Sequence, residues 1–500
     1  MVCWNNDSTT WPKSPRFLDI RKQNQRVIGA ARAYFKKCVE SHNCSSSLNI
    51  HIPTRLINVG IEGDEMIRLF EPGNSQVPIK SAALSYCWGG QVNTFKTTSQ
   101  NVDVHYAKGF SLSLLPRTIR DAVEVTRDLG ILYLWVDTLC IIQGEDETAR
   151  DDWHSEVNRM HEVYRGAYVT ISAASASNAD GGLSSCGHCI VPCTGECWYA
   201  SFYLELPGED PIETRGWTLQ EHVLSSRLLA FTNHGVQWRC NQMARETSRM
   251  ELMDLRPNIT SNWIALVENY CLRALSVESD KLPAIAALAH EHAKITGDKY
   301  LAGLWDSNIL QHLLWYCRTG ESRRPGSYRA PTWSWASVDA RVKSKRVDQC
   351  ASLEEVWHFF LKWAGVTELL AEVIKCEVQL ENPEYPFSKV VSGTLTISGL
   401  VYGPIQTVKS TDPDGNAVLA STSAGNVGKL YYDPTWSIQN CRPTSYIVIS
   451  SAYLEHASAI AIRPIDDSND VSIRVGLIIA YYSESENMIQ DGEVRTIKIV

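Results

Sequence analysis

Two acidic residues in the first half of the chain, Asp137 and Glu156, are the leading candidates for chemistry. Asp137 directly follows residues 131–136, an unbroken apolar run that is typical of a strand buried on both faces of a parallel sheet. Ligands of open α/β sheets bind outside the carboxyl ends of the strands. The position of Asp137 therefore predicts a carboxylate beside a ligand site.

Glu156 lies on a helix that the sequence predicts at residues 153–166. The predicted buried stripe of this helix comprises Trp153, Val157, Met160, Tyr164 and Ala167. Glu156 falls at the edge of that stripe, and because burial disfavours a charged carboxylate, it must be paired or protonated. Two interpretations stay open. Glu156 caps a backbone group or pairs with an arginine, or it is a functional acid with a raised pKa in a pocket shared with Asp137.

Cys140 follows Asp137 by three positions and is the third candidate for catalysis. A free cysteine is most often a small apolar core residue, and we favour that interpretation here. A nucleophilic role would require a nearby base or a helix N-terminus that stabilises the thiolate.

Cysteine residues crowd one short segment, where the thiols that could bind zinc are Cys186, Cys189, Cys193 and Cys197. Four thiolates suit a tetrahedral zinc site, although zinc ribbons separate their ligand pairs by about 12–20 residues. Cys38, His42 and Cys44 form a second, weaker set. The chain has 15 cysteines, an odd number, which favours reduced thiols in a cytoplasmic protein over a disulfide framework.

The elements that must position these residues form a predicted βαβαβ unit. Strands are expected at residues 82–86, 131–136 and 168–173, and helices at residues 116–129 and 153–166. We predict an α/β fold with a small, mostly parallel sheet flanked by helices, followed by a helical segment and a C-terminal β-rich region. The expected domains are residues 1–78 (lead-in), 79–240 (α/β domain), 241–330 (helical segment) and 331–500 (β-rich region).

The second half of the chain is expected to contain helices at residues 263–275 and 283–295. Its expected strands are residues 393–401, 445–452, 472–482 and 495–500. Residues 412–428 are rich in Gly, Ser and Asn, and this composition predicts a loop.

The composition argues against several classes of function. A net charge of −9 gives no basic surface for nucleic acid as the main partner. No apolar stretch approaches the ~20 residues of a membrane-spanning helix, and residues 1–16 do not resemble a secretory signal. Gly-x-Ser-x-Gly, Gly-x-Gly-x-x-Gly and His-Glu-x-x-His are absent, which disfavours an α/β-hydrolase, an ordinary NAD dehydrogenase and a zinc protease.

Several ordered blocks of the chain resemble the fungal heterokaryon incompatibility (HET) domain family. The core blocks read ALSYCWG at 83–89, LPRTIRDA at 115–122, LWVDTLCIIQ at 134–143, RGWTLQE at 215–221 and LSSR at 224–227, with Asp152, Trp153, Glu156, Met160 and Tyr164 between them. The flanks PTRLI at 53–57 and APTWSWAS at 330–337 also resemble this family. The resemblance covers residues 30–340.

This resemblance implies a cytoplasmic fungal protein of non-self recognition and programmed cell death, with a TIR- or flavodoxin-like core. Some TIR domains hydrolyse NAD with a helical glutamate near a tryptophan, and Glu156 with Trp153 resembles that pair. The candidate catalytic residues are then Glu156, Asp137 and Cys140. The candidate ligand-binding residues are Tyr86, Trp88, Trp153, Arg215, Trp217, Gln220 and Glu221.

Three functions stay open. The first is a HET-type effector whose core binds or hydrolyses a nucleotide such as NAD, with Trp88 or Trp153 stacking on the base. The second is a non-catalytic module for signalling or self-association as a homo-oligomer. The third is an enzyme of fungal specialised metabolism, in which the two acids, Cys140 or His234 catalyse cyclisation, dehydration or addition on a small hydrophobic compound.

Overall fold

The chain divides into two compact units, one of Met1–Ile212 with Leu224–Met253 and one of Glu213–Val223 with Asp254–Val500. The finer division into four regions stays a prediction. The structure is a computed structural model, and the residues it describes are 20–44, 52–73, 79–90, 95–183, 190–192, 210–233, 235–242, 263–344, 368–408, 418–422, 425–432, 444–452, 456–465, 471–481 and 493–500.

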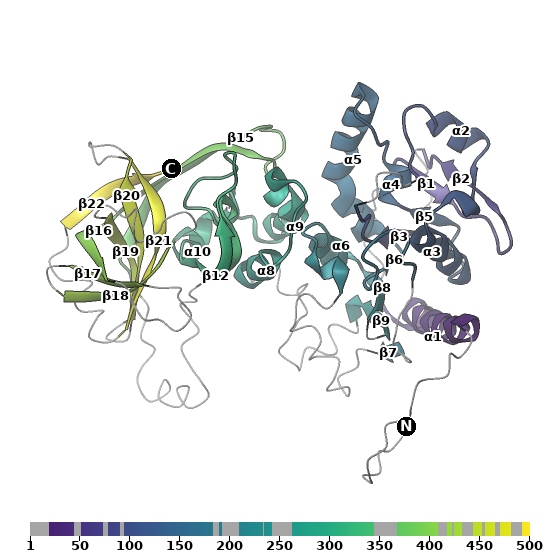
Figure 1. Ribbon diagram of the computed structural model, residues 1–500, viewed down its shortest axis with the longest axis horizontal. Helices are drawn as coiled ribbons and strands as arrows, with labels where there is room; N and C mark the ends of the chain where they lie inside the picture. The colour runs from purple at the N-terminus through teal and green to yellow at the C-terminus, as the bar shows by residue number, and fades with distance from the viewer. Residues whose placement is uncertain are drawn as a thin grey trace, which may run out of the picture. The chain divides into compact units, whose positions relative to one another are not determined.

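A nine-stranded sheet forms the centre of the first unit, in the order β4-β2-β1-β5-β3-β6-β8-β9-β7 (Figure 1). Its strands are β1 (Leu56–Asn58), β2 (Met66–Phe70), β3 (Ser81–Ser85), β4 (Phe110–Ser111), β5 (Tyr133–Trp135), β6 (Val169–Ser172), β7 (Ile190–Pro192), β8 (Arg227–Thr232) and β9 (Gly235–Cys240). The central strands β5, β3, β6 and β8 are parallel. Numbered along the chain, their order is 2-1-3-4, as in flavodoxin-like sheets.

The sheet is parallel mainly at its centre, which corrects the expectation of a mostly parallel sheet. β1 pairs antiparallel with β2 and β5, β4 with β2, and β9 with β8, whereas β7 is parallel to β9. The reason is the length of the connections, because parallel neighbours need a crossover of about a dozen residues or more. Only residues 233–234 separate β8 from β9, so this pair forms a hairpin.

The helices of this unit are α1 (Ile20–Ser41), α2 (Val102–Ala107), α3 (Arg117–Asp128), α4 (Asp137–Cys140) and α5 (Glu147–Gly166). The connections through α3 and α5 cross the sheet in opposite directions, so right-handed connections place these helices on opposite faces. α5 begins earlier than the expected residue 153 because Asp146 caps it, accepting the Ala149 N–H at 3.0 Å.

The buried strand expected at residues 131–136 is present but shorter. Leu134, Trp135 and Val136 are at most 1% exposed, whereas Leu132 is 52% exposed. Leu132 lies outside β5, in the segment that follows α3. The run is therefore covered on both faces only over its second half, which leads directly into Asp137.

The second unit combines helices with a large β-region. Its α-helices are α6 (Thr218–Leu224), which ends at the first residue assigned to the other unit, α8 (Trp263–Tyr270), α9 (Ala286–Thr296) and α10 (Ile309–His312). Two small antiparallel sheets pair β10 (Tyr300–Leu301) with β11 (Leu304–Trp305) and β12 (Trp315–Arg323) with β13 (Asp339–Ser344). The helices expected at residues 263–275 and 283–295 are present as α8 and α9, but α8 ends earlier, at Tyr270, and residues 283–285 form a 3-10 turn before α9.

A second nine-stranded sheet occupies the C-terminal part of this unit. Its strands are β14 (Glu368–Leu369), β15 (Ala371–Leu380), β16 (Val390–Val408), β17 (Val418–Thr422), β18 (Gly425–Tyr432), β19 (Thr444–Ala452), β20 (His456–Pro464), β21 (Val471–Tyr481) and β22 (Glu493–Ile499). β16, β19, β21 and β22 confirm the strands expected there. The loop expected at residues 412–428 is wrong in part, because β17 and the start of β18 fall inside it and pair as a hairpin.

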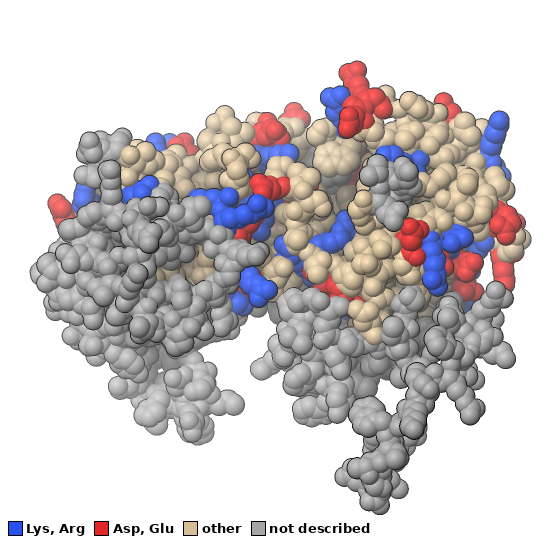
Figure 2. Space-filling view, viewed as in Figure 1, with Lys and Arg blue, Asp and Glu red and all other residues tan. Residues whose placement is uncertain are grey.

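Charged side chains of both signs are interspersed over the face of the molecule in Figure 2. Among the helices that the structure describes, none combines the length and the apolar character that crossing a lipid bilayer requires.

Candidate functional site

The carboxyl edge of the parallel strands carries the first candidate residues. Trp88 follows β3, and Asp137 begins α4 just after β5. The Trp88 indole Nε1 donates a hydrogen bond to Asp137 Oδ2 at 2.7 Å, and the Thr138 backbone N–H donates to Oδ1 at 2.7 Å. The chain passes from β3 to β5 on one side and returns to β6 on the other, and crevices at such reversals bind ligands. Trp88 follows β3, one of the two strands that flank this reversal, and Asp137 lies next to it at the end of the neighbouring strand β5.

The loops after β3 and β6 fix the position of Trp88. Gly89 has a φ of +76°, and a Cβ there would lie 2.5 Å from the Cβ of Asn178. The Ala179 N–H donates to the Trp88 carbonyl at 3.3 Å. Because only glycine allows this approach, the two loops pack directly on each other beside Asp137.

Tyr86 directly follows β3 and contacts α4. Its side chain is 2% exposed, and its hydroxyl lies 2.9 Å from Thr138 Oγ1. Thr138 is the residue whose N–H holds Asp137, so this buried contact positions the carboxylate. The geometry gives Tyr86 a supporting role, and its direct contact with a ligand stays a prediction.

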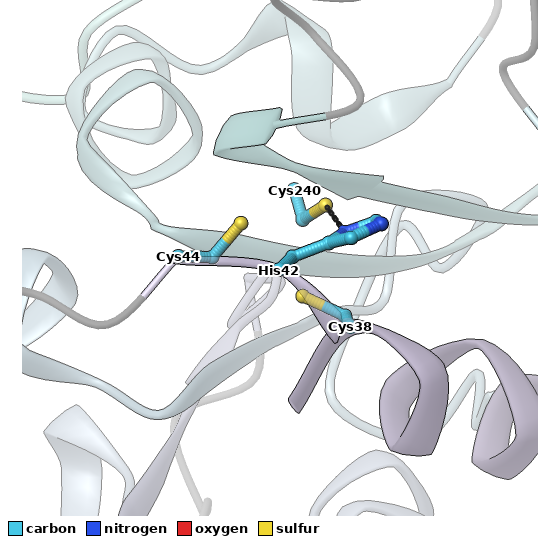
Figure 3. A group of neighbouring side chains, drawn as sticks. All are labelled: Cys38, His42, Cys44 and Cys240. Atoms are coloured by element: carbon cyan, nitrogen blue, oxygen red, sulfur yellow. Dashed lines mark hydrogen bonds between the residues drawn. The ribbon is translucent and has the colours of Figure 1, made fainter. Parts of the chain in front are cut away.

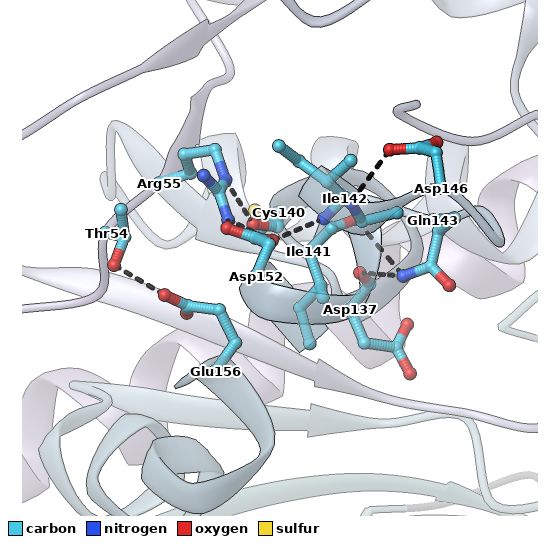
Figure 4. A network of polar contacts seen from close by, with 11 residues as sticks. Thr54, Arg55, Asp137, Cys140, Ile141, Ile142, Gln143, Asp146, Asp152 and Glu156 are labelled. Atoms are coloured by element: carbon cyan, nitrogen blue, oxygen red, sulfur yellow. Dashed lines mark hydrogen bonds and ion pairs between the residues drawn. The ribbon is translucent and has the colours of Figure 1, made fainter. Parts of the chain in front are cut away.

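A second polar cluster, the Arg55 network, lies on the other side of α4 (Figure 4). Arg55 is 6% exposed, and its Nη2 atom lies 2.5 Å from both carboxylate oxygens of Asp152. Arg55 Nε donates to the Cys140 carbonyl at 2.6 Å, and Asp152 Oδ2 accepts the Ile142 N–H at 2.7 Å. Burial lowers the pKa of Arg55, but the hydrogen bonds and charge of Asp152 outweigh it and raise the pKa overall. The network therefore ties the start of β1 to α4 and α5.

Glu156 belongs to the edge of this network. It is 3% exposed, and its Oε1 accepts a hydrogen bond from the Thr54 hydroxyl at 2.5 Å. Burial raises the pKa of Glu156, against smaller opposing effects of Thr54 and of the nearby Arg55 charge. The side chain thus combines elements of both interpretations: it lies near an arginine, and its acidity is weakened by burial.

Cys140 is the last residue of α4 and lies within electrostatic reach of both acids. It is fully buried, and its sulfur accepts the Val136 N–H at 3.4 Å. Burial raises the pKa of this thiol to about 12. A nucleophilic cysteine needs a lowered pKa, so the geometry favours the structural interpretation.

Asp137 and Glu156 have different hydrogen-bond partners. Asp137 accepts hydrogen bonds from Trp88, in the loop after β3, and from Thr138 in α4, whereas Glu156 accepts one from Thr54 before β1. In Figure 4 the Asp137 carboxylate points away from Glu156, with the turn around Ile141 between them. A single pocket shared by both acids stays a prediction.

The comparison with protein families gives one match, at residues 82–190, to the family described as Heterokaryon incompatibility protein (HET). The chain carries a HET domain. Comparisons with curated proteins and with solved structures give no match.

The HET domain contains the βαβαβ unit from β3 to β6 and ends at the start of β7. Trp88, Asp137 and Glu156 therefore lie inside it. Thr54 and Arg55 precede the matched residues, yet they supply partners to Glu156 and Asp152 inside it. The segment before the HET domain thus completes the Arg55 network.

Trp153 lies within the HET domain, but its placement corrects the predicted stripe of α5. It is 40% exposed and packs edge-to-face against His154, with ring centroids 5.2 Å apart. The buried face instead runs through Ala149, Glu156, Met160, Val163, Tyr164 and Ala167. The acid therefore lies within the buried face, because the stripe is rotated from the predicted direction.

The remaining candidate ligand-binding residues, Arg215, Trp217, Gln220 and Glu221, belong to the second unit. Gln220 and Glu221 are buried on α6. The Arg215 carbonyl accepts a hydrogen bond from Arg273, whose pKa burial lowers to about 10 while Glu213 and Glu221 oppose that shift. These contacts lie within the second unit, and a ligand role for the four residues stays a prediction.

The two metal-site predictions have different outcomes. Cys186, Cys189, Cys193 and Cys197 lie outside the described residues, as does His234. The weaker set of Cys38, His42 and Cys44 converges in the structure and is joined by Cys240. Cys240 could not be associated with this set from the sequence, because it lies 198 residues beyond His42.

Sequence reasoning also missed Arg55 and Asp152 as a buried pair. Both residues were part of the blocks that resemble the family, but their spacing along the chain gave no sign of contact. A usable signal was the expected burial of Glu156, because a buried carboxylate calls for a cation nearby.

Proposed function

We propose that this HET-domain protein acts in a fungal heterokaryon-incompatibility response, in non-self recognition linked to programmed cell death. We further propose that its α/β unit binds a nucleotide such as NAD at the carboxyl edge. The observation that carries this second proposal is the Trp88–Asp137 pair at the carboxyl edge, with Trp88 in the loop after β3, next to the point where the strand order reverses.

The two side chains have the chemistry that a nucleotide needs. A carboxylate at the end of a parallel strand can accept hydrogen bonds from ribose hydroxyls. Trp88 is partly buried, and its indole can stack on a base, an interaction worth about 1–3 kcal/mol in single-strand binding proteins. The Trp88 and Thr138 donors orient Asp137 before a ligand arrives.

Hydrolysis would break the bond between the anomeric carbon of the ribose and the nicotinamide nitrogen. Water would add to that carbon, and nicotinamide would leave with the bonding electron pair. A carboxylate near the anomeric carbon stabilises the positive charge that develops there. We propose Asp137 as the carboxylate that contacts the nucleotide, and Glu156 as the acid required for turnover.

Binding is tested by titrating the full chain with NAD in a calorimeter. Asp137→Asn is expected to weaken binding at least tenfold, and Trp88→Phe to weaken it severalfold. Asp151→Asn is the matched control, because Asp151 is an exposed acid on α5. Wild-type protein that does not bind NAD at millimolar concentration would refute the nucleotide site.

Turnover is tested separately by measuring nicotinamide release by chromatography. Glu156→Gln is expected to retain binding and lose release, while the Asp151→Asn control retains both. Full nicotinamide release by Glu156→Gln would remove Glu156 from the reaction. Binding without release in the wild-type protein would favour a non-catalytic signalling module.

The biological role is tested by inducible expression in a fungal host. We expect growth arrest with the wild-type chain and weaker arrest with Asp137→Asn at equal protein level. Normal growth with both proteins, in hosts that carry different incompatibility alleles, would contradict the proposed response.

A cavity within the second unit, lined by Trp263, Trp315 and Trp335 among others, bears on the alternative of a specialised-metabolism enzyme. Its acid, Glu268, accepts hydrogen bonds from Lys343 and from the Ser344 N–H. Its histidine, His312, accepts the Trp305 N–H, and burial lowers its pKa to about 4. Because these groups are engaged in holding the fold, we give precedence to the carboxyl edge of the HET domain.

A further inference from the structure

Four potential metal ligands meet at the end of α1 (Figure 3). Cys38 lies in the last turn of the helix, His42 directly follows it, and Cys44 comes two positions later. Cys240, the last residue of β9, completes the group. The three sulfur atoms and a ring nitrogen all lie within 4.8 Å of one another.

The separation of these atoms is close to that of a zinc site. Zn–S bonds of about 2.3 Å and Zn–N bonds of about 2.0 Å place tetrahedral ligand atoms about 3.5–3.8 Å apart. His42 Nδ1 already lies 3.3 Å from Cys240 Sγ. The longest separation in the group exceeds the tetrahedral value by about 1 Å, which side-chain rotation can close.

Two of the sulfur atoms accept hydrogen bonds from residues outside the group of four. Arg227 Nε donates to Cys38 Sγ at 3.3 Å, and the Gln242 N–H donates to Cys44 Sγ at 3.3 Å. Metal-bound ligands characteristically have such outer hydrogen-bond partners. Three thiolates with one divalent ion carry a net charge of −1, and the guanidinium of Arg227, which is 2% exposed, offsets it. The Arg227 guanidinium would thus serve as an outer partner of a metal-bound Cys38 thiolate.

The backbone around the ligands is also held in place. The Asn43 N–H donates to Gln242 Oε1 at 3.2 Å, so residues 42–44 lie along residues 240–242. The Asn241 N–H donates to the Ser226 carbonyl at 3.2 Å, which anchors the second segment to the residue before β8. The four ligands therefore come from two segments that already contact each other.

We propose that Cys38, His42, Cys44 and Cys240 bind one structural Zn²⁺ ion. Three cysteines and one histidine form a common closed zinc site, which leaves no open position for water or substrate. Binding releases the protons of the three thiols. The ion would join the N-terminal helix to the hairpin of β8 and β9, and so fasten α1 to the sheet that carries the HET domain.

The first test measures metal content and coordination in the full chain. A Cys186→Ser/Cys189→Ser background removes two of the four thiols of the cysteine-rich segment, so that the remaining zinc reports on the proposed site. We expect one zinc per chain by mass spectrometry. Replacement by Co²⁺ should give thiolate charge-transfer bands and the visible spectrum of a tetrahedral ion.

Three variants in that background identify the ligands. Cys44→Ser with Cys240→Ser is expected to lose the zinc, whereas Cys376→Ser, a partly exposed cysteine outside the group, keeps it. His42→Cys keeps four ligands and the fold, and its Co²⁺ bands should shift to longer wavelength because a fourth thiolate replaces imidazole. This variant remains informative if the double variant fails to fold.

Three outcomes would overturn the proposal. The first is protein in that background that contains no zinc and takes up no Co²⁺. The second is an unchanged Co²⁺ spectrum in folded His42→Cys. The third is a disulfide among Cys38, Cys44 and Cys240, found by counting free thiols in freshly purified, unreduced protein.

Discussion

The two edges of the sheet in the first unit carry opposite kinds of chemistry. At the carboxyl edge, Trp88 lies in the loop after β3, and Asp137 lies at the start of α4, just after β5. At the amino edge, Cys240 pairs with Arg227, the first residue of β8, and lies within reach of Cys38. The carboxyl edge presents polar side chains next to the reversal of strand order. The amino edge brings buried thiols close together.

One sheet thus separates ligand binding at its carboxyl edge from anchoring at its amino edge. A site that exchanges ligands needs partly accessible groups oriented by a rigid framework, as Trp88 and Thr138 orient Asp137. A site that only fastens a helix is best closed, as with Cys38 and Cys44, which are at most 1% exposed. Changes at the two edges should therefore separate ligand binding from stability.

Removing Arg55 should have the largest effect on stability. Arg55→Ala leaves Asp152 and Glu156 buried without their cation, and breaking a buried pair of this kind costs about 3–5 kcal/mol. Arg32→Ala is the matched control, because its ion pair with Asp128 is exposed and should be worth at most about 1 kcal/mol. Urea denaturation of the full chain measures both, and equal losses would show that the Arg55 network is not a buried ion pair.

Removing zinc should have the next largest effect, and only on stability. If free zinc is about 100-fold above its dissociation constant, binding contributes about 2.7 kcal/mol. A chelator should then lower the melting temperature of the first unit by about 5–10 °C. NAD binding at low temperature, where the unit stays folded, should be unchanged. A loss of NAD affinity in folded, zinc-free protein would contradict the claim that the amino edge affects stability alone.

The pH dependence of stability should distinguish Glu156 from an ordinary acid. Burial raises the pKa of Glu156, so its favourable contribution is complete below its unfolded pKa and is lost as pH rises through its folded pKa. The stability of Glu156→Gln relative to wild type should therefore increase with pH above about 4.3. Denaturation midpoints measured between pH 4 and 8 give this difference.

Asp146 provides a control of opposite sign. The Ala149 N–H and the Ser99 hydroxyl lower the pKa of Asp146, so its contribution is present above its unfolded pKa and is lost as pH falls. The stability of Asp146→Asn relative to wild type should therefore decrease as pH rises through the acidic range. Parallel pH profiles for the two variants would contradict the assigned environment of Glu156.

The sequence predicted the elements near the HET site because their signals are local. The apolar run before Asp137 indicated a buried strand, and the expectation of a buried Glu156 is confirmed. The predicted start of α5 is wrong because Asp146 caps the helix earlier in the chain. The predicted stripe is wrong at Trp153, because this apolar side chain is 40% exposed.

Contacts between distant segments could not be predicted in the same way. Arg55 meets Asp152 across 97 positions, and His42 meets Cys240 across 198. Neither pair has a spacing that marks it, since it is the folding of β1 beside β5 and of α1 against β9 that brings them together. The polar partners of the site and the fourth metal ligand therefore required the tertiary structure.

The smallest predicted effect gives the finest test of the carboxyl edge. Tyr86→Phe removes a buried hydroxyl beside Thr138, and Tyr164→Phe removes a hydroxyl that donates to the Leu84 carbonyl at 3.1 Å. Each variant should lose about 0.5–1.5 kcal/mol of stability. Only Tyr86→Phe should also weaken NAD binding, by about two- to fivefold, because Thr138 orients Asp137 while Leu84 lies within β3. Equal effects of both variants on NAD affinity would mean that α4 is not the element that positions the carboxylate.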